Sequence, residues 1–507
     1  MTGLFGSLNT ATSGLRAQQV GLQTTSHNLA NANTVGYSRQ RVTLEANTPQ
    51  SYAGIGQIGT GVLLKGITRV TDDFVTAQLQ NEQAALNRFQ QESDIIGQLE
   101  SVYNEPSTSG LGHQMSELFV SWGNLGANPE SITSKTMVIR QTETFLDTVN
   151  HATNKMDDLA GETLRLIEKD VLDFNDLSKQ LKDVQDHIFN ATVKGEMPND
   201  LLDKQDMIIG QMKGIAGVQV DSSDKYGRQF VKLGEEYIVS ENEVKELAMV
   251  KKDTEIDGKT VDGQDIVTVD TEIDGKTVKT VKAGTIGIKT QENPNTIKIT
   301  VSFEMKSGSI KGIQDGRDVV LAKRKELTGF VDQLATAINT IHSDGDPEDT
   351  KKIVFTQLEN GQYEVNDILL KDPSKLVTGK ALDNSVAGDG SRAKAIADLQ
   401  QISLGGTSEY DSEKMNFTTD ASGSTLFNKY NDIVTDMGIT KQQADNMVAN
   451  QTDLTALLEQ RQASVAGVDL NEEVINMIQY QSAFQANSRV ISTIAEMLDT
   501  LINRTGV

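Results

Sequence analysis

Leucines that recur at every seventh residue near the start of the chain constrain its fold more than any other feature. A seven-residue apolar repeat forms one narrow stripe along an α-helix, and such a stripe is buried by packing against a second helix. The sequence therefore predicts a helix over residues 4–32 that needs a partner helix. The leucines are Leu8, Leu15, Leu22 and Leu29.

The other end of the chain provides a matching helix. The seven-residue spacing recurs along it, Asp469 precedes it as a suitable N-cap, and Gly506 follows it. We expect the two terminal segments, residues 1–35 and 466–507, to pair as a coiled coil. The apolar residues concerned are Leu470, Met477, Phe484, Ile491 and Leu498.

A turn follows the first helix. Asparagine and glycine favour turn or left-handed backbone conformations that end helices, whereas the next residues up to Val42 favour an extended conformation. We expect this turn to set the angle between the first helix and the rest of the chain. The turn residues are Asn31, Asn33, Thr34 and Gly36, followed by Tyr37 and Arg39.

The length and charge of the chain exclude several classes of protein. Its 507 residues exceed one ordinary hydrophobic core, so roughly two to four domains are expected. A net charge of −24 argues against nucleic acid or an anionic membrane as partner, because both are polyanions. The absence of cysteine excludes disulfides and thiolate sites. We expect neither a signal peptide nor a membrane-spanning segment.

Between its ends the chain alternates between helical and strand-like patterns. Apolar residues between 216 and 314 alternate as in strands, and this segment contains the repeat DTEIDGKTV at residues 253–261 and 270–278. Each copy predicts a hairpin turn at Asp-Gly, namely Asp257-Gly258 and Asp274-Gly275. Helical spacing elsewhere predicts helices that begin at Thr71, Ile132, near Phe174, Pro198, Asp318, Thr425 and Thr440.

These patterns together predict a multidomain α+β fold. The long heptad helices favour a helical bundle, and the strand-like segments favour inserted domains. We expect a terminal coiled coil of residues 1–35 with 466–507, a helical core of residues 36–215 with 315–345 and 425–465, a β-rich insertion of residues 216–314, and a second mixed insertion of residues 346–424.

Motifs that would indicate an enzyme or a cofactor lack their structural context. The GxGxxG pattern at residues 54–59 precedes an extended segment instead of a helix, which argues against a dinucleotide site. His342 suits a helix cap or packing, because the other histidines supply no metal-ligand spacing. Neither HExxH nor GxSxG occurs. We therefore expect no catalytic residue, no cofactor and no metal.

Residues 28–37 read NLANANTVGY, which resembles the N-terminal signature of the bacterial flagellar axial proteins that build the rod, the hook and the hook-filament junction. The next residues, 38–40, and the segment Gly467 to Glu473 resemble the junction branch, the FlgK family of hook-associated proteins. Matches at residues 198–203 and 334–345 extend the resemblance into the core.

This resemblance implies a structural, non-enzymatic subunit outside the cell, exported by the flagellum's own type III apparatus with its N-terminal region uncleaved. It implies self-assembly as a ring or helical layer, contacts with the hook protein and a second junction protein, and an export chaperone on the C-terminal helix. The terminal-helix and turn residues named above would then act in assembly.

Two alternatives stay open. The chain could be another axial protein, of the hook or the distal rod, although Ser38-Arg39-Gln40 argues for the junction branch. A secreted hydrolase is less favoured, since the sequence lacks the motifs of its active site.

Overall fold

The computed structural model describes residues 2–52, 56–103, 107, 110–255, 265–269, 280–293, 296–382 and 386–504. The chain forms two compact units. We call residues 1–88, 168–310 and 450–507 the terminal unit, and residues 89–167 and 311–449 the helical unit. The four regions predicted from the sequence divide the chain at different boundaries, and that division stays a prediction.

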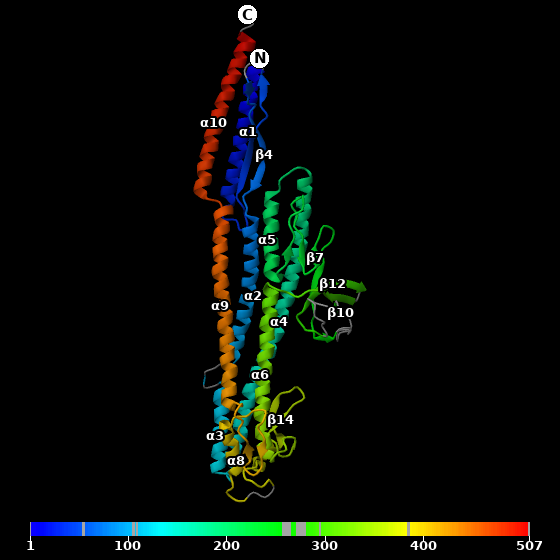
Figure 1. Cartoon of the computed structure of the whole chain (residues 1–507), viewed down its shortest axis with the longest axis vertical. Coiled ribbons are helices and arrows are strands. Elements are labelled where there is room, and N and C mark those ends of the chain that lie inside the picture. Colours follow the sequence, from blue (N-terminus) through cyan, green and yellow to red (C-terminus); the bar gives the residue numbers. More distant parts are fainter. Residues whose placement is uncertain are drawn as a thin grey trace. The chain divides into compact units, whose positions relative to one another are not determined.

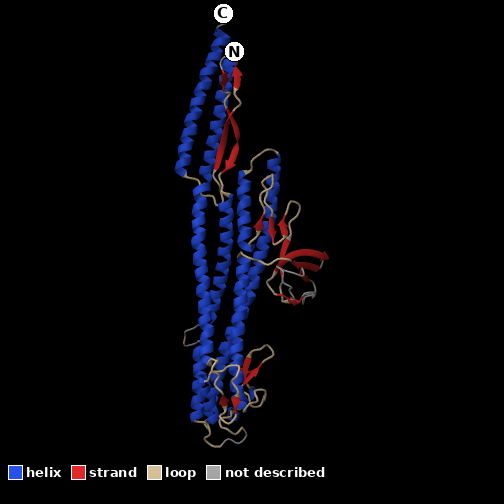
Figure 2. Ribbon diagram, viewed as in Figure 1, coloured by secondary structure: helices blue, strands red, loops and turns tan. Residues whose placement is uncertain are grey.

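Helices dominate both units, and small sheets accompany them, which confirms the predicted α+β class (Figures 1 and 2). The helices at the two ends of the chain were both predicted, the first to within two residues at each end. The α-helices are α1 (Thr2–Asn31), α2 (Asp73–Tyr103), α3 (Leu111–Ala127), α4 (Ile132–Val193), α5 (Asn199–Ala216), α6 (Ser309–Ser343), α7 (Asp367–Lys371), α8 (Ser391–Asp398), α9 (Leu426–Ala466) and α10 (Leu470–Asp499).

Two long helices are continuous where the sequence predicted a break. The heptad stretches that begin at Ile132 and near Phe174 belong to the single helix α4. Thr440 does not begin a new helix. It lies within α9, where its hydroxyl donates to the carbonyl of Asp436 one turn earlier at 2.8 Å. A threonine that bonds backwards in this way is compatible with a helix interior.

The starts of two other helices also differ from prediction. Helix α2 is capped by Asp72 instead of Thr71, because the Asp72 carboxylate accepts hydrogen bonds from the backbone N–H groups of Phe74 and Val75 at 3.1 and 3.2 Å. Helix α6 begins at Ser309, earlier than the predicted Asp318. Helix α3 was not predicted at all, and its buried face carries Trp122.

The terminal unit contains a hairpin beside α1 and several small sheets. Strand β1 (Gln40–Ala46) pairs antiparallel with β4 (Val62–Arg69), and both contact α1. The predicted β-rich segment forms a three-stranded sheet of order β5-β6-β7 and a four-stranded sheet of order β10-β13-β12-β8. Both predicted Asp-Gly turns lie outside the described residues. The other strands are β2 (Gln50–Tyr52), β3 (Gly56–Ile58), β5 (Gln219–Val220), β6 (Val231–Leu233), β7 (Glu236–Val239), β8 (Glu246–Met249), β9 (Thr254–Glu255), β10 (Asp265–Val269), β11 (Thr280–Val281), β12 (Ile286–Asn293) and β13 (Thr296–Val301).

Each unit has its own apolar core. In the terminal unit, the buried residues of α4 and α5 include Phe174, Leu181 and Ile208. In the helical unit, Trp122 of α3 and Phe330 of α6 are fully buried, and α3 packs against α8. The short strands of this unit are β14 (Phe355–Gln357), β15 (Tyr363–Val365), β16 (Tyr410–Asp411) and β17 (Asn416–Phe417).

Candidate functional site

Helices α1 and α10 pair in antiparallel directions within the terminal unit (Figure 1). Their contacts recur at seven-residue intervals along both helices. At Gly21 an added Cβ atom would lie 2.8 Å from the Tyr480 ring, so the missing side chain lets the ring reach the helix backbone. The contacting pairs are Gly14 with Asn487, Gly21 with Tyr480 and Asn28 with Glu473.

This pairing confirms that the two ends of the chain are partners, whereas the assembly role of the residues predicted for it stays a prediction. The buried residues of α1 are small or polar, and the predicted leucines lie beside them, half-buried. On α10, Leu470 is exposed, Glu473 and Ile494 are buried, and the other predicted residues, Met477, Phe484, Ile491 and Leu498, are half-buried. The buried residues of α1 are Ala11, Ala17, Gly21, Thr24, Thr25 and Asn28, and its half-buried leucines are Leu8, Leu15, Leu22 and Leu29.

The turn after α1 has the geometry that its sequence predicts. The backbone N–H of Thr34 donates to the carbonyl of Asn31 at 2.9 Å, and the Thr34 hydroxyl donates to the Asn31 side chain at 3.2 Å. Gly36 has φ of +79°, a left-handed conformation that side chains disfavour. The Tyr37 hydroxyl then donates back to the Asn28 Oδ1 atom at 2.7 Å, which fixes the turn against the helix.

Asn28 is the centre of a polar cluster that joins α1, the turn, β1 and α10. Its Oδ1 atom also accepts from the backbone N–H of Gln40 at 3.0 Å, and its Nδ2 atom donates to the Gln40 carbonyl at 2.9 Å and to Glu473 at 3.1 Å. An asparagine side chain has two donors and two acceptor positions. All four are used here, which suits its complete burial.

Arg39 connects this cluster to the start of α10. Its guanidinium contacts Glu472 at 2.7 Å and the buried Glu473 at 2.8 Å, and its backbone N–H donates to the carbonyl of Ala466 at 2.9 Å. Asp469 caps α10 as predicted, since its side chain accepts from the backbone of Asn471 at 2.8 Å. The turn and the first residues of α10 are thus bound to each other.

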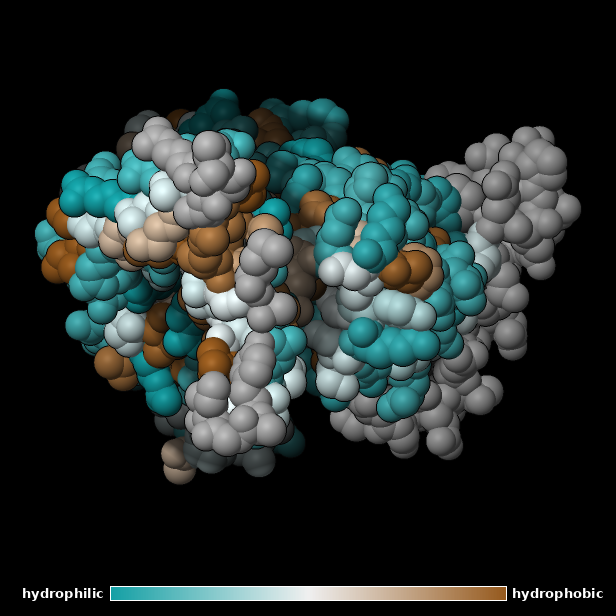
Figure 3. Space-filling model, turned by 90° about the horizontal axis from the view of Figure 1, so that it is seen from above, coloured by the Kyte–Doolittle hydropathy of each residue, from teal (hydrophilic) through white to brown (hydrophobic). Residues whose placement is uncertain are grey.

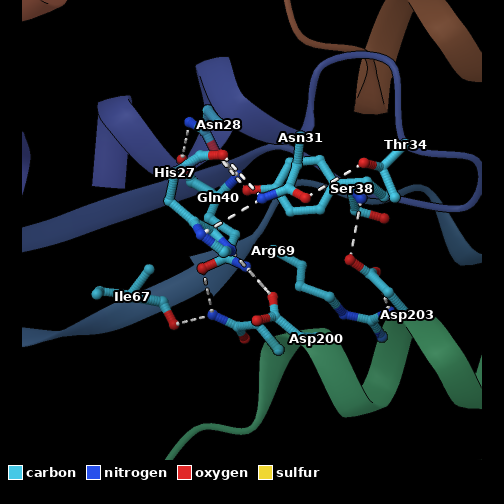
Figure 4. A network of polar contacts seen from close by, with 12 residues as sticks. His27, Asn28, Asn31, Thr34, Ser38, Gln40, Ile67, Arg69, Asp200 and Asp203 are labelled. Atoms are coloured by element: carbon cyan, nitrogen blue, oxygen red, sulfur yellow. Dashed lines mark hydrogen bonds and ion pairs between the residues drawn. The ribbon is translucent and has the colours of Figure 1, made fainter. Parts of the chain in front are cut away.

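Helix α5 supplies a second set of carboxylates to the same cluster (Figure 4). Asp203 accepts from the backbone N–H of Ser38 at 3.0 Å and from Arg69 of β4 at 2.8 Å, and Asp206 also binds Arg69, at 2.7 Å. Asp200 accepts from the Gln40 side chain at 2.7 Å. Burial raises the pKa of Asp206, and Arg69 opposes that shift. We call the cluster of Asn28, Tyr37, Arg39, Gln40, Arg69, Asp200, Asp203, Asp206 and Glu473 the polar node.

Comparison with known proteins identifies the family. The family model described as "Flagellar hook-associated protein FlgK helical domain" matches residues 96–352, about half of the chain. The models "Flagella basal body rod protein" and "Flagellar basal body rod FlgEFG protein C-terminal" match residues 8–37 and 460–504. The chain belongs to the FlgK family.

Relatives of the FlgK family match over nearly the whole chain. Flagellar hook-associated protein 1 of Bacillus subtilis is 26% identical and covers 100% of this chain and 99% of its own length. Its namesake in Escherichia coli is also 26% identical, over 98% and 99%. The flagellar hook junction protein FlgK of Burkholderia pseudomallei, at 13% identity, shares the fold with a TM-score of 0.58 over 77% of this chain and 100% of that one. The chain is therefore a structural protein of the flagellar hook-filament junction.

The polar node of this FlgK family member was missed by sequence reasoning, although some of its residues belong to the motifs that indicated the family. Asp200 and Asp203 lie in the segment 198–203, and Glu473 follows the cap of α10. A polar residue at a position that faces a partner helix, such as Asn28 or Glu473, is the signal that sequence reasoning could have used.

The residues considered for cofactor or metal chemistry have structural roles. His342 is buried, its Nε2 atom accepts from the backbone N–H of Val377 at 3.1 Å, and Nδ1 contacts the carbonyl of Lys352. Burial lowers the pKa of His342 to about 4. Within the part of the chain that the structure describes, His, Asp and Glu side chains do not group in a way that could hold a metal ion. Strand β4, not a helix, follows the GxGxxG segment.

Proposed function

We propose that the chain polymerises with copies of itself as a layer between hook and filament, with the paired helices α1 and α10 as the assembly element. The observation that carries this proposal is the apolar surface that the pair leaves uncovered. Exposed apolar residues continue along α10 on the sides that do not contact α1, and surfaces of this kind mark sites of protein association. They include Val474, Ile475, Ile478, Val490 and Met497.

We also propose the partners and the route that the family suggests. The subunit would leave the cell through the flagellar type III apparatus, contact the hook protein on one side and a second junction protein on the other, and offer α10 to an export chaperone.

Hydrophobic residues are interspersed among hydrophilic ones on the face seen in Figure 3. Among the described helices, none is both long and apolar enough to cross a membrane. A non-enzymatic role accords with the packing and hydrogen bonds of His342 described above.

A strain that lacks the chain provides the test. Complementation with Ile478→Asp should yield hooks without filaments and filament protein free in the medium, because a carboxylate would be buried at the subunit contact. Ser488→Asp, an exposed polar position about a quarter turn away from Ile478 on the surface of the same helix, is the matched control and should restore filaments. Normal filaments with Ile478→Asp would contradict the proposed role of α10.

A further inference from the structure

The terminal unit carries a groove beside the turn that the fold itself does not fill. It lies among α2, α4 and α5 and has a volume of about 720 Å³. Val35 and Met207 form an apolar lip at one side, and Val35 is 88% exposed. Asp173 and Asp176 of α4 also line it. The described residues that line this groove include those two carboxylates but neither a lysine nor an arginine.

Asp173 of the groove is only weakly neutralised within the subunit. Asp173 lies 3.2 Å from Lys169 on the same helix, but both side chains are exposed to solvent. An exposed pair of this kind contributes little free energy, because water and salt screen it. The groove therefore suits a partner surface that combines cationic and apolar side chains.

The chain itself has one region with that chemistry. Residues 1–70 contain five lysine or arginine residues and one acidic residue, a net charge of +4. Since the whole chain carries −24, residues 71–507 carry −28. Arg39 and Arg69 are bound in the polar node, whereas Arg41 and Lys65 are exposed on the hairpin of β1 and β4.

The same hairpin also exposes apolar side chains. Leu44 of β1 lies directly opposite Leu64 of β4, and both are exposed, as is the adjacent Leu63. Opposed side chains on neighbouring strands form a continuous patch. Lys65 is weakly held, since its ammonium lies 3.6 Å from the exposed Glu45. The hairpin thus exposes leucines and a cation at three consecutive positions of β4, residues 63–65.

We propose that the hairpin of one subunit docks in the groove of the next copy of this chain, with its leucines against Val35 and Met207 and its cations near Asp173 and Asp176. The proposal rests on the polymerisation proposed above. Hairpin and groove are different surfaces of one subunit, so the contact is heterologous, and repeated heterologous contacts build rings or helical layers. A contact of this kind would give the junction its lateral order.

The absence of cysteine from the chain permits a direct test. The variant Leu64→Cys/Met207→Cys should form a ladder of disulfide-linked copies when junctions assembled on hooks are oxidised, because a disulfide requires Cα atoms within about 7 Å. The ladder should be absent from unassembled subunits and from either single-cysteine variant. The control Leu64→Cys/Met137→Cys, which uses an exposed methionine of the helical unit, should form no ladder.

Junctions that assemble normally but give no ladder would overturn the docking proposal while leaving the proposed function intact. A cross-link from Leu64→Cys to another flagellar protein would overturn it as well. Absence of the unaltered chain from the junction would instead count against the proposed function, so the two failures are distinguishable.

Charge reversal provides a second measurement that does not depend on cross-linking geometry. Arg41→Glu/Lys65→Glu should reduce the number of filaments per cell, and the further changes Asp173→Lys/Asp176→Lys in the same chain should restore it. Failure of the combined variant to recover, with each protein folded by circular dichroism, would contradict the pairing of these two surfaces.

Discussion

Glu472 and Glu473 are neighbours in sequence and both bind Arg39, yet they lie in different surroundings. The Glu473 side chain is 2% exposed, whereas that of Glu472 is 59% exposed. When one partner of a buried ion pair is removed, the remaining charge is left uncompensated. When one partner of an exposed pair is removed, water solvates the remaining charge. The two residues therefore offer a matched comparison.

Replacement of Glu473 by alanine should destabilise the attachment of α10 by about 3 kcal/mol, the lower end of the range for buried pairs because Arg39 keeps Glu472. Glu472→Ala should cost less than about 1 kcal/mol. Amide hydrogen exchange of the first turns of α10, measured in assembled junctions, reports both changes. Equal effects of the two substitutions would show that burial of Glu473 does not matter.

Gly36 tests the turn separately from the ion pairs. Its left-handed φ should make Gly36→Val cost about 1–2 kcal/mol, whereas Gly36→Asn should be tolerated, because asparagine adopts this conformation more readily. We expect the valine variant to lose filament attachment more than core stability, measured by motility and by urea unfolding. Motility that survives Gly36→Val would refute the assigned role of the turn.

The polar node could not be predicted as a unit because its contacts join residues far apart in the chain. Asn28 bonds to Glu473, and Ser38 bonds to Asp203. Residue type and spacing predicted the turn, its left-handed glycine and the Asp469 cap, since those features depend on neighbours in sequence. Which carboxylates face Arg39 and Arg69 depends on the packing of α5 and α10, which local patterns do not encode.

At the scale of elements, the packing of α1 on α10 relies on small residues. Gly21→Ala should weaken this pairing, because its Cβ atom would lie 2.8 Å from the Tyr480 ring, although alanine is the better helix former. Gly6→Ala is the control, since a Cβ atom there meets nothing within 4 Å, and it should stabilise α1 by up to about 1 kcal/mol. Hydrogen exchange of α1 amides in assembled junctions distinguishes the two variants, and equal protection in both would argue against close packing at Gly21.

The positions of the helices along the chain were predicted better than the residues that each helix buries. Periodicity located α1, α2, α4, α5, α6, α9 and α10, because apolar spacing reflects the face that each helix buries. It assigned the contact of α1 to its leucines, whereas the structure buries the small residues beside them. Helix α3 escaped prediction because its glycines, such as Gly123 and Gly126, resemble loop residues.

At the scale of the whole molecule, we expect the terminal helices to be mostly disordered in the free subunit and to order on assembly. Small buried side chains contribute little apolar area, and the glycines of α1 each cost about 1 kcal/mol relative to alanine. Residues 36–465 alone should fold and fail to build a junction. Amide exchange on the monomer decides the matter, since strong protection across Leu8–Leu29 and Met477–Leu498 would refute the prediction.

The seven-residue interval between contacts has a consequence for the alignment of α1 with α10. If α10 slipped along α1 by one heptad, about 10 Å, Tyr480 would face Gly14, which also lacks a side chain and would admit the ring. The same slip would move Glu473 away from Asn28 and Arg39 and leave its carboxylate buried without partners. Close packing alone thus permits two alignments of the terminal helices, and a single buried carboxylate selects between them.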